Sequence, residues 1–384
     1  MNAFIVKKKQ KENGYLVNLT KSNIQDTFNM INLFKKSFAR FGQEIGIDLG
    51  TTKTLVYVKD KGIVINEPTV VVINNKTNQI LAIGREAIEM VGKTPPHISA
   101  IRPLSNGVIS DFEVTEKMLR HFLDKAVRKN FLNNLINRPK LVVGIPCGGT
   151  EVEKRAVEDA ARSAGAKEVY FIEAPVAVAL GIRLPIKESK GVFIVDIGGG
   201  TTEAAVISLG GVVVYKSLRV AGNKLNDDII YYLKEKYKLA VGERTVEAIK
   251  IAIGSAMDLG SNQEIKVKGR DLTKGLPKEI KIKEIDIREA ITSSLNKIID
   301  AIQDTLEVTP PELIADIITN GIYLSGGTSL LRGLDKLISN NIGLTVKIIE
   351  DPTTAVIRGV GFVLEDLKSS RDLLININRE KSPI

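Results

Sequence analysis

One pattern occurs twice in the chain, as Ile47-Asp48-Leu49-Gly50-Thr51-Thr52 and as Val195-Asp196-Ile197-Gly198-Gly199-Gly200-Thr201-Thr202. Each copy joins an apolar strand, an aspartate, a glycine turn and a threonine pair, and a second apolar stretch follows at 55–58 and at 204–207. A single Asp-x-Gly is often only a turn, but two copies about one domain apart indicate a duplicated α/β unit.

Both copies contain groups suited to binding phosphate. Glycines allow a tight turn in which backbone N–H groups converge on an anion, and threonine hydroxyls add further donors. Asp48 and Asp196 would repel a bare phosphate, so we expect a hydrated Mg²⁺ between them and the ligand. The predicted phosphate-binding residues are Gly50, Thr51, Thr52, Gly198, Gly199, Gly200, Thr201 and Thr202.

Two later segments complete the candidate site. The first is a strand running into a glycine turn and then a helix over 322–331, with Gly326, Gly327, Thr328 and Ser329 at the turn. The second is a helix over 245–253, on which Glu247 and Lys250 are three residues apart and share one face. Alone this pair would be a surface ion pair; beside the glycine elements it could contact a base or ribose.

These elements, in this order, resemble those of the superfamily of actins, sugar kinases and heat-shock chaperones. Further stretches are similar to the bacterial actin family MreB over about residues 42 to 367. They are Ile45 to Thr51, Asp196 to Glu203, Glu151 to Val157, Arg244 to Gly254, and Thr309-Pro310-Pro311-Glu312-Leu313.

The resemblance implies an α/β, actin-like ATPase fold in which two RNase H-like domains, each with a smaller inserted subdomain, enclose a cleft for ATP or ADP with Mg²⁺. The expected domain I is 42–188 with 357–384 and an insertion at 76–108. The expected domain II is 189–356 with an insertion at 225–287. It also implies self-association into antiparallel double protofilaments that determine cell shape.

Two residues depart from the pattern of the family. Its members usually have a glutamate that orients the attacking water at the position of Ala174, which here follows Glu173. An alanine cannot do this, and Glu173 is a weak substitute, so we expect slow hydrolysis although the assisting Thr201 is retained. Lys53 replaces a usual asparagine and either contacts phosphate or points to solvent.

The excess of positive charge is distributed unevenly along the chain and is concentrated in the N-terminal region. Residues 1–29 are polar and are predicted to be a flexible extension, unless translation begins at Met30. In 30–41, Met30, Phe34, Phe38 and Phe41 fall on one helical face beside lysines and an arginine. This favours an amphipathic helix on an anionic membrane over a helix packed on its own domain. The resemblance adds the apolar loop Phe131-Leu132 as a second contact and a peripheral position on the inner face of the cell membrane.

Composition narrows the function classes. One cysteine excludes an internal disulfide and fits a reducing cytoplasm, and two unpaired histidines disfavour a histidine metal site or a Ser-His-Asp triad. The net charge of +9 is read as a solvated lysine-rich face, with no nucleic-acid partner.

The sequence lacks segments that two alternative functions of the superfamily would need, but it is compatible with a third. A small-molecule kinase needs an acceptor pocket, and a chaperone needs a peptide-binding domain after the body; neither is evident in the sequence. A non-polymerising regulator of another filament shares every motif. Paralogous filaments and membrane cytoskeletal or cell-wall synthesis proteins are further expected partners, and a specialised role such as motility stays open.

Overall fold

The computed structural model describes residues 43–127 and 138–375. The predictions for 1–29, for the helix at 30–41 and for the loop Phe131-Leu132 lie outside these residues. Among the described helices, none has the length and apolar character needed to cross a membrane.

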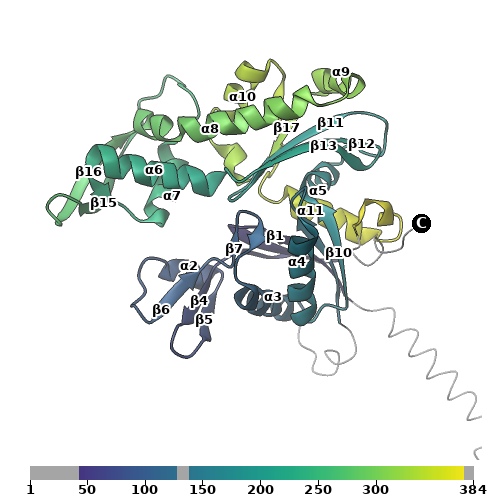
Figure 1. Cartoon of the computed structure of the whole chain (residues 1–384), viewed down its shortest axis with the longest axis horizontal. Helices are drawn as coiled ribbons and strands as arrows, with labels where there is room; N and C mark the ends of the chain where they lie inside the picture. The colour runs from purple at the N-terminus through teal and green to yellow at the C-terminus, as the bar shows by residue number, and fades with distance from the viewer. Residues whose placement is uncertain (1–42, 128–137, 376–384) are drawn as a thin grey trace, which may run out of the picture. The chain divides into compact units, whose positions relative to one another are not determined.

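Two five-stranded sheets form the framework (Figure 1). The first has the order β10-β9-β1-β2-β3 and consists of β1 (Glu44–Leu49), β2 (Lys53–Val58), β3 (Gly62–Pro68), β9 (Lys140–Ile145) and β10 (Glu168–Glu173). The second has the order β13-β12-β11-β17-β18 and consists of β11 (Val192–Ile197), β12 (Thr202–Ser208), β13 (Gly211–Leu218), β17 (Ile322–Ser325) and β18 (Val346–Ile348).

The sheets have matching topology. In each, the strand that carries the aspartate pairs antiparallel with the next strand along the chain and parallel with a later one. A third antiparallel strand and a second parallel strand complete both sheets in corresponding positions. This match confirms the duplicated α/β unit.

Two helices, α5 (Ala174–Gly181) and α11 (Ala355–Glu365), lie between the sheets. Their buried side chains pack on Leu55 and Val142 of the first sheet and on Ile194 of the second. Gly46 permits the close approach of α11, because a Cβ there would lie 2.5 Å from Val360 Cγ1. A strand that is covered on both faces consists of consecutive apolar residues, as residues 192–195 of β11 do.

The outer faces are covered by other helices. On the first sheet, α3 (Phe112–Ala126) and α4 (Glu151–Ser163) bury residues that include Met118, Phe122 and Ala160. On the second, the apolar sides of α6 (Gly222–Tyr237), α8 (Glu284–Glu307), α9 (Pro311–Asn320) and α10 (Leu334–Ile342) pack against Phe193, Val195 and Ile197. Alternate residues of β11 therefore face different cores.

Two smaller sheets lie in or next to the ranges expected for the insertions. One has the order β5-β4-β6, with β4 (Val71–Asn74), β5 (Gln79–Ile83) and β6 (Ile98–Ile101), next to α2 (Arg85–Met90). The other has the order β14-β15-β16, with β14 (Leu239–Ala240), β15 (Glu264–Asp271) and β16 (Pro277–Lys283), next to α7 (Glu243–Ile253). Because β4 pairs with β5 and β6, the first small sheet begins before residue 76. The division into two domains at the expected boundaries stays a prediction.

Four short elements remain in the described part of the chain. They are β7 (Leu104–Ser105), β8 (Val108–Ile109), the 3-10 helix η1 (Gly327–Leu330) and η2 (Arg371–Leu373). The helix expected after Gly326 is only η1, and α10 begins seven residues later, after Gly333. Both glycines have positive φ (82° and 74°), which divides the segment.

Candidate functional site

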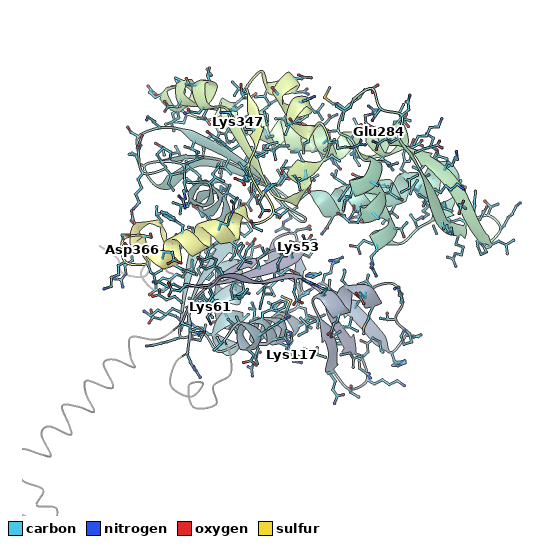
Figure 2. All side chains as sticks on the ribbon, turned by 180° about the vertical axis from the view of Figure 1, so that it is seen from behind. Lys53, Lys61, Lys117, Glu284, Lys347 and Asp366 are labelled. Carbon is cyan, nitrogen blue, oxygen red and sulfur yellow. The ribbon has the colours of Figure 1, made fainter. Side chains whose placement is uncertain are left out.

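A cavity of about 430 Å³ lies where the two copies of the repeat meet. The third glycine segment and α7 contribute to its wall. The predicted residues that line it are Asp48, Gly50, Thr51, Thr52, Lys53, Ala174, Asp196, Gly198, Gly199, Gly200, Thr201, Glu247, Lys250, Gly326, Gly327 and Thr328. Lys53 is the first residue of β2 and lines this cavity, and Lys61 lies in the turn after the other end of the strand; Figure 2 labels both.

Three predicted residues do not line the cavity. The Thr202 hydroxyl donates to the Val220 carbonyl at 2.7 Å, and the Ser329 hydroxyl donates to the Gly326 carbonyl at 2.6 Å. Both side chains are buried and hydrogen-bonded within their own loops, and the expectation that they contact a ligand stays a prediction.

Glu173 is the third. It is the N-cap residue of α5, and its carboxylate interacts with the Cys147 thiol and Lys154, while burial raises its pKa. Ala174 lines the cavity and Glu173 does not. That Glu173 is a poor substitute for the usual glutamate stays a prediction.

Glycine is required at close contacts between the loops that surround the cavity. A Cβ on Gly200 would lie 2.5 Å from Thr51 Oγ1, and one on Gly222 would lie 2.7 Å from Thr328 Oγ1. The Thr51 hydroxyl also accepts a hydrogen bond from Gly107 N–H at 3.0 Å, in the turn between β7 and β8. These contacts leave backbone, rather than side chains, facing the space between the loops.

Asp48 and Asp196 end matching strands and converge on the cavity. Burial, and then the charge of Asp196, raises the pKa of Asp48 to about 7. Burial raises the pKa of Asp196 to about 6, against a hydrogen bond with Ser325. Two carboxylates held this close in a buried site favour a shared cation.

The acidic residues fit a cation that arrives with ligands of its own. Asp196 Oδ1 is buried without a hydrogen-bond partner. Within 43–127 and 138–375, no cluster of three or more histidine, cysteine, aspartate or glutamate side chains could hold a metal alone. Mg²⁺ keeps several waters and commonly combines one or two carboxylates with phosphate oxygens, so the residues present fit it.

The other wall is built by α7. Lys250 is 9% exposed, and its ammonium donates to Glu247 Oε2 at 2.8 Å and to the Gly222 carbonyl at 3.0 Å. Arg332 fixes the end of this helix by donating to the Ile253 and Gly254 carbonyls. The ion pair predicted from its spacing is therefore present and partly buried beside the cavity.

Sequence reasoning missed Glu203, Asn223 and Arg332 as lining residues. Glu203 is 2% exposed and pairs in register with Asp196 across β11 and β12. A signal was available, since Glu203 follows the threonine pair of the second repeat as Lys53 follows that of the first.

The comparisons with known proteins agree with this geometry. The family model for the MreB/Mbl protein matches residues 42–372. The chain belongs to the MreB/Mbl family. Its curated relatives include the cell shape-determining protein Mbl of Bacillus subtilis, 44% identical over 327 residues that cover 85% of this chain and 97% of the relative. The cell shape-determining protein MreB of Escherichia coli K12 is 45% identical over 337 residues, covering 87% and 96%.

Solved structures of MreB/Mbl relatives show the same fold. MreB5 of Spiroplasma citri bound to ADP superposes with a TM-score of 0.81 at 38% identity, covering 86% of this chain and 98% of that one. The structure of the same protein bound to AMPPNP gives the same values. The MamK double helical filament has a TM-score of 0.71 at 23% identity, which concerns the fold alone. The expected actin-like α/β fold is confirmed.

Proposed function

We propose that this MreB/Mbl family member binds ATP or ADP with Mg²⁺ in the cavity between the repeats. It polymerises into membrane-associated filaments that determine cell shape. The observation that carries the proposal is the convergence of Asp48 and Asp196, from two corresponding sheets, on one cavity lined by glycine loops. The MreB5 structures with ADP and AMPPNP support the choice of ligand.

Each wall of the cavity has its own task in this proposal. Backbone N–H groups at Gly50, Gly199 and Gly200 hold the phosphates, with the Thr51, Thr52 and Thr201 hydroxyls beside them. Asp48 and Asp196 hold Mg²⁺ through its waters, and the metal neutralises phosphate charge. Glu247 and Lys250 lie where the ribose and base extend, and Lys53 offers a point charge to a phosphate.

Hydrolysis is slow in this proposal. Ala174 presents only a methyl group to the cavity, and Glu173 is not among the residues that line it. Removing a group that orients or deprotonates water typically costs about 10²–10⁴-fold in rate. The filaments would therefore keep their nucleotide longer than those of a relative with a glutamate at this position.

The assembly and location are proposed from family membership and sequence. The names of the curated relatives support cell-shape determination. Antiparallel double protofilaments on the inner face of the cell membrane, attached through 30–41 and Phe131-Leu132, complete the proposal, with other filaments and cell-wall synthesis proteins as partners.

The experiment is polymerisation on anionic liposomes with ATP, with ADP and without nucleotide, followed by sedimentation and electron microscopy. We expect filaments on the liposomes with ATP and few without nucleotide. A chain that binds ATP yet forms no filaments would instead be a regulator. A chain that does not bind ATP would refute the whole proposal.

A further inference from the structure

Glu203 is a buried carboxyl group of the cavity to which the proposed function assigns no task. Burial, and then the charge of Asp196, raises its pKa well above the ordinary value, and a cation bound at Asp48 and Asp196 would favour its ionised, hydrogen-bond-accepting form. Its Oε2 accepts a hydrogen bond from Cys147 N–H at 3.3 Å. Its Oε1 has no hydrogen-bond partner within the described part of the chain, and this oxygen keeps some exposure to solvent. Since Glu203 lines the cavity, this free acceptor faces it.

A backbone hydrogen bond ties Glu203 to the strand ends of the first sheet, where Ala174 leaves its position without a functional group. Cys147 follows β9, and Ala174 follows β10, the parallel neighbour of β9. The hydrogen bond from Cys147 N–H therefore ties Glu203, from the second sheet, to the strand ends of the first sheet where Ala174 lies. Both residues line the same cavity.

We propose that Glu203 orients the water that attacks the γ-phosphate in this chain, by accepting a hydrogen bond from it. This inference rests on the proposed function. The water oxygen forms a bond to the γ-phosphorus, and the bond to the bridging oxygen breaks with its electron pair going to ADP. Both water protons stay on the inorganic phosphate, so Glu203 needs to give or take none.

The substitution Glu203→Gln tests the role of the unpaired Oε1 atom. The amide oxygen can still accept from Cys147 N–H, which turns the NH₂ group toward the cavity and replaces an acceptor by a donor. We expect phosphate release to fall at least tenfold, while affinity for AMPPNP and ADP and the melting temperature stay near those of the wild type. Filaments formed with ATP should also persist longer in a sedimentation assay.

A second variant separates water orientation from a structural role. In the Ala174→Glu background the new carboxylate supplies the missing acceptor, so adding Glu203→Gln should cost less than threefold. If Glu203 had only a structural role, Glu203→Gln would lower the rate of phosphate release by the same factor in both backgrounds. Glu158→Gln is the matched control, because Glu158 is also buried but pairs with Arg162 away from the cavity.

The outcomes are distinguishable. Glu203→Gln hydrolysing at the wild-type rate, equal losses in both backgrounds, or a wild type that releases no phosphate over hours would each overturn the inference. Should Glu203→Gln fail to bind AMPPNP, Glu203→Asp decides: it withdraws the acceptor by one methylene, and an unchanged rate would overturn the inference. A wild type that binds no nucleotide would refute the proposed function itself.

Discussion

Gly199 and Thr52 lie so close that a Cβ on Gly199 would be 1.8 Å from Thr52 Oγ1. The two residues come from the two copies of the repeat, at the turns that follow their aspartates. Only a glycine at 199 lets the turns approach each other. The spacing between the two halves of the cavity is therefore set by a missing side chain.

Gly199→Ala should weaken nucleotide binding. The added methyl group must displace Thr52 or separate the turns, and overpacking of this kind costs about 1–3 kcal/mol. We expect the Kd for ATP to rise about tenfold or more in a titration with fluorescent nucleotide. Gly211→Ala is the control, because a Cβ at Gly211 meets nothing within 4 Å. Equal affinity in the two variants would contradict the close approach.

Ala174→Glu should accelerate hydrolysis without improving binding. The new carboxylate would line the cavity, where it can orient the attacking water. We expect steady-state phosphate release to rise at least tenfold, with the Kd for AMPPNP changed less than threefold. Glu173→Gln, one residue earlier and outside the cavity wall, should leave the rate unchanged. An accelerated Glu173→Gln, or an unaccelerated Ala174→Glu, would show that another group limits the reaction.

Much of this site was predictable from local pattern. Strand, aspartate, glycine and threonine recur in order along the chain, and two facing copies of such a loop can hold one polyphosphate between them. This predicted Asp48 and Asp196 at a common cavity, and spacing alone predicted the Glu247–Lys250 pair. The duplicated sheet followed from the same pattern.

The placements that the sequence did not indicate depend on side-chain direction and on contacts between distant segments. Thr202 begins β12, so its side chain and that of Glu203 point to opposite faces of the sheet, a choice fixed by pairing with β11. Ser329 lies in a 3-10 turn whose backbone takes its hydroxyl. The contact of Gly199 with Thr52 joins segments far apart in sequence, and no local pattern encodes it.

Asp48→Asn should stabilise the nucleotide- and magnesium-free protein increasingly as pH rises. The pKa of Asp48 is about 3.8 unfolded and about 7 folded, raised by burial and then by Asp196. Between these values folding takes up a proton, so wild-type stability falls as pH rises toward 7. The variant lacks this loss. Its advantage in melting temperature should be small at pH 5 and largest at pH 7.5 and above.

For Asp286→Asn we expect the difference in stability from the wild type to change with pH in the opposite direction. Burial alone would raise the pKa of Asp286, but hydrogen bonds from Lys236 and Lys283 N–H lower it overall. A depressed pKa contributes stability above the unfolded pKa and loses it as pH falls. This variant should therefore be less stable than the wild type at pH 7.5, by an amount that shrinks as pH falls below about 3.8. Parallel slopes for the two variants would contradict the assignment.

The pair Arg102–Glu243 should slow the release of nucleotide. Arg102 follows β6 and its Nη2 donates to Glu243 Oε1 at 2.6 Å, while the neighbouring Arg244 donates to the Glu89 carbonyl of α2 at 3.3 Å. Glu243 begins α7, whose later turns carry Glu247 and Lys250 in the cavity wall. The ion pair thus joins the small sheet of the first half to the helix that bounds the ligand.

The expected effect is modest, because the two side chains are 27% and 40% exposed and such pairs contribute about 0.2–1 kcal/mol. Glu243→Gln should speed the release of fluorescent ADP about two- to fivefold in stopped flow, more at low than at high salt. Exchanging the charges with Arg102→Glu and Glu243→Arg should restore most of the wild-type rate. Glu116→Gln, which breaks a surface pair with Arg120 on α3, is the control. If the charge exchange releases ADP as fast as Glu243→Gln, the pair does not hold the cleft.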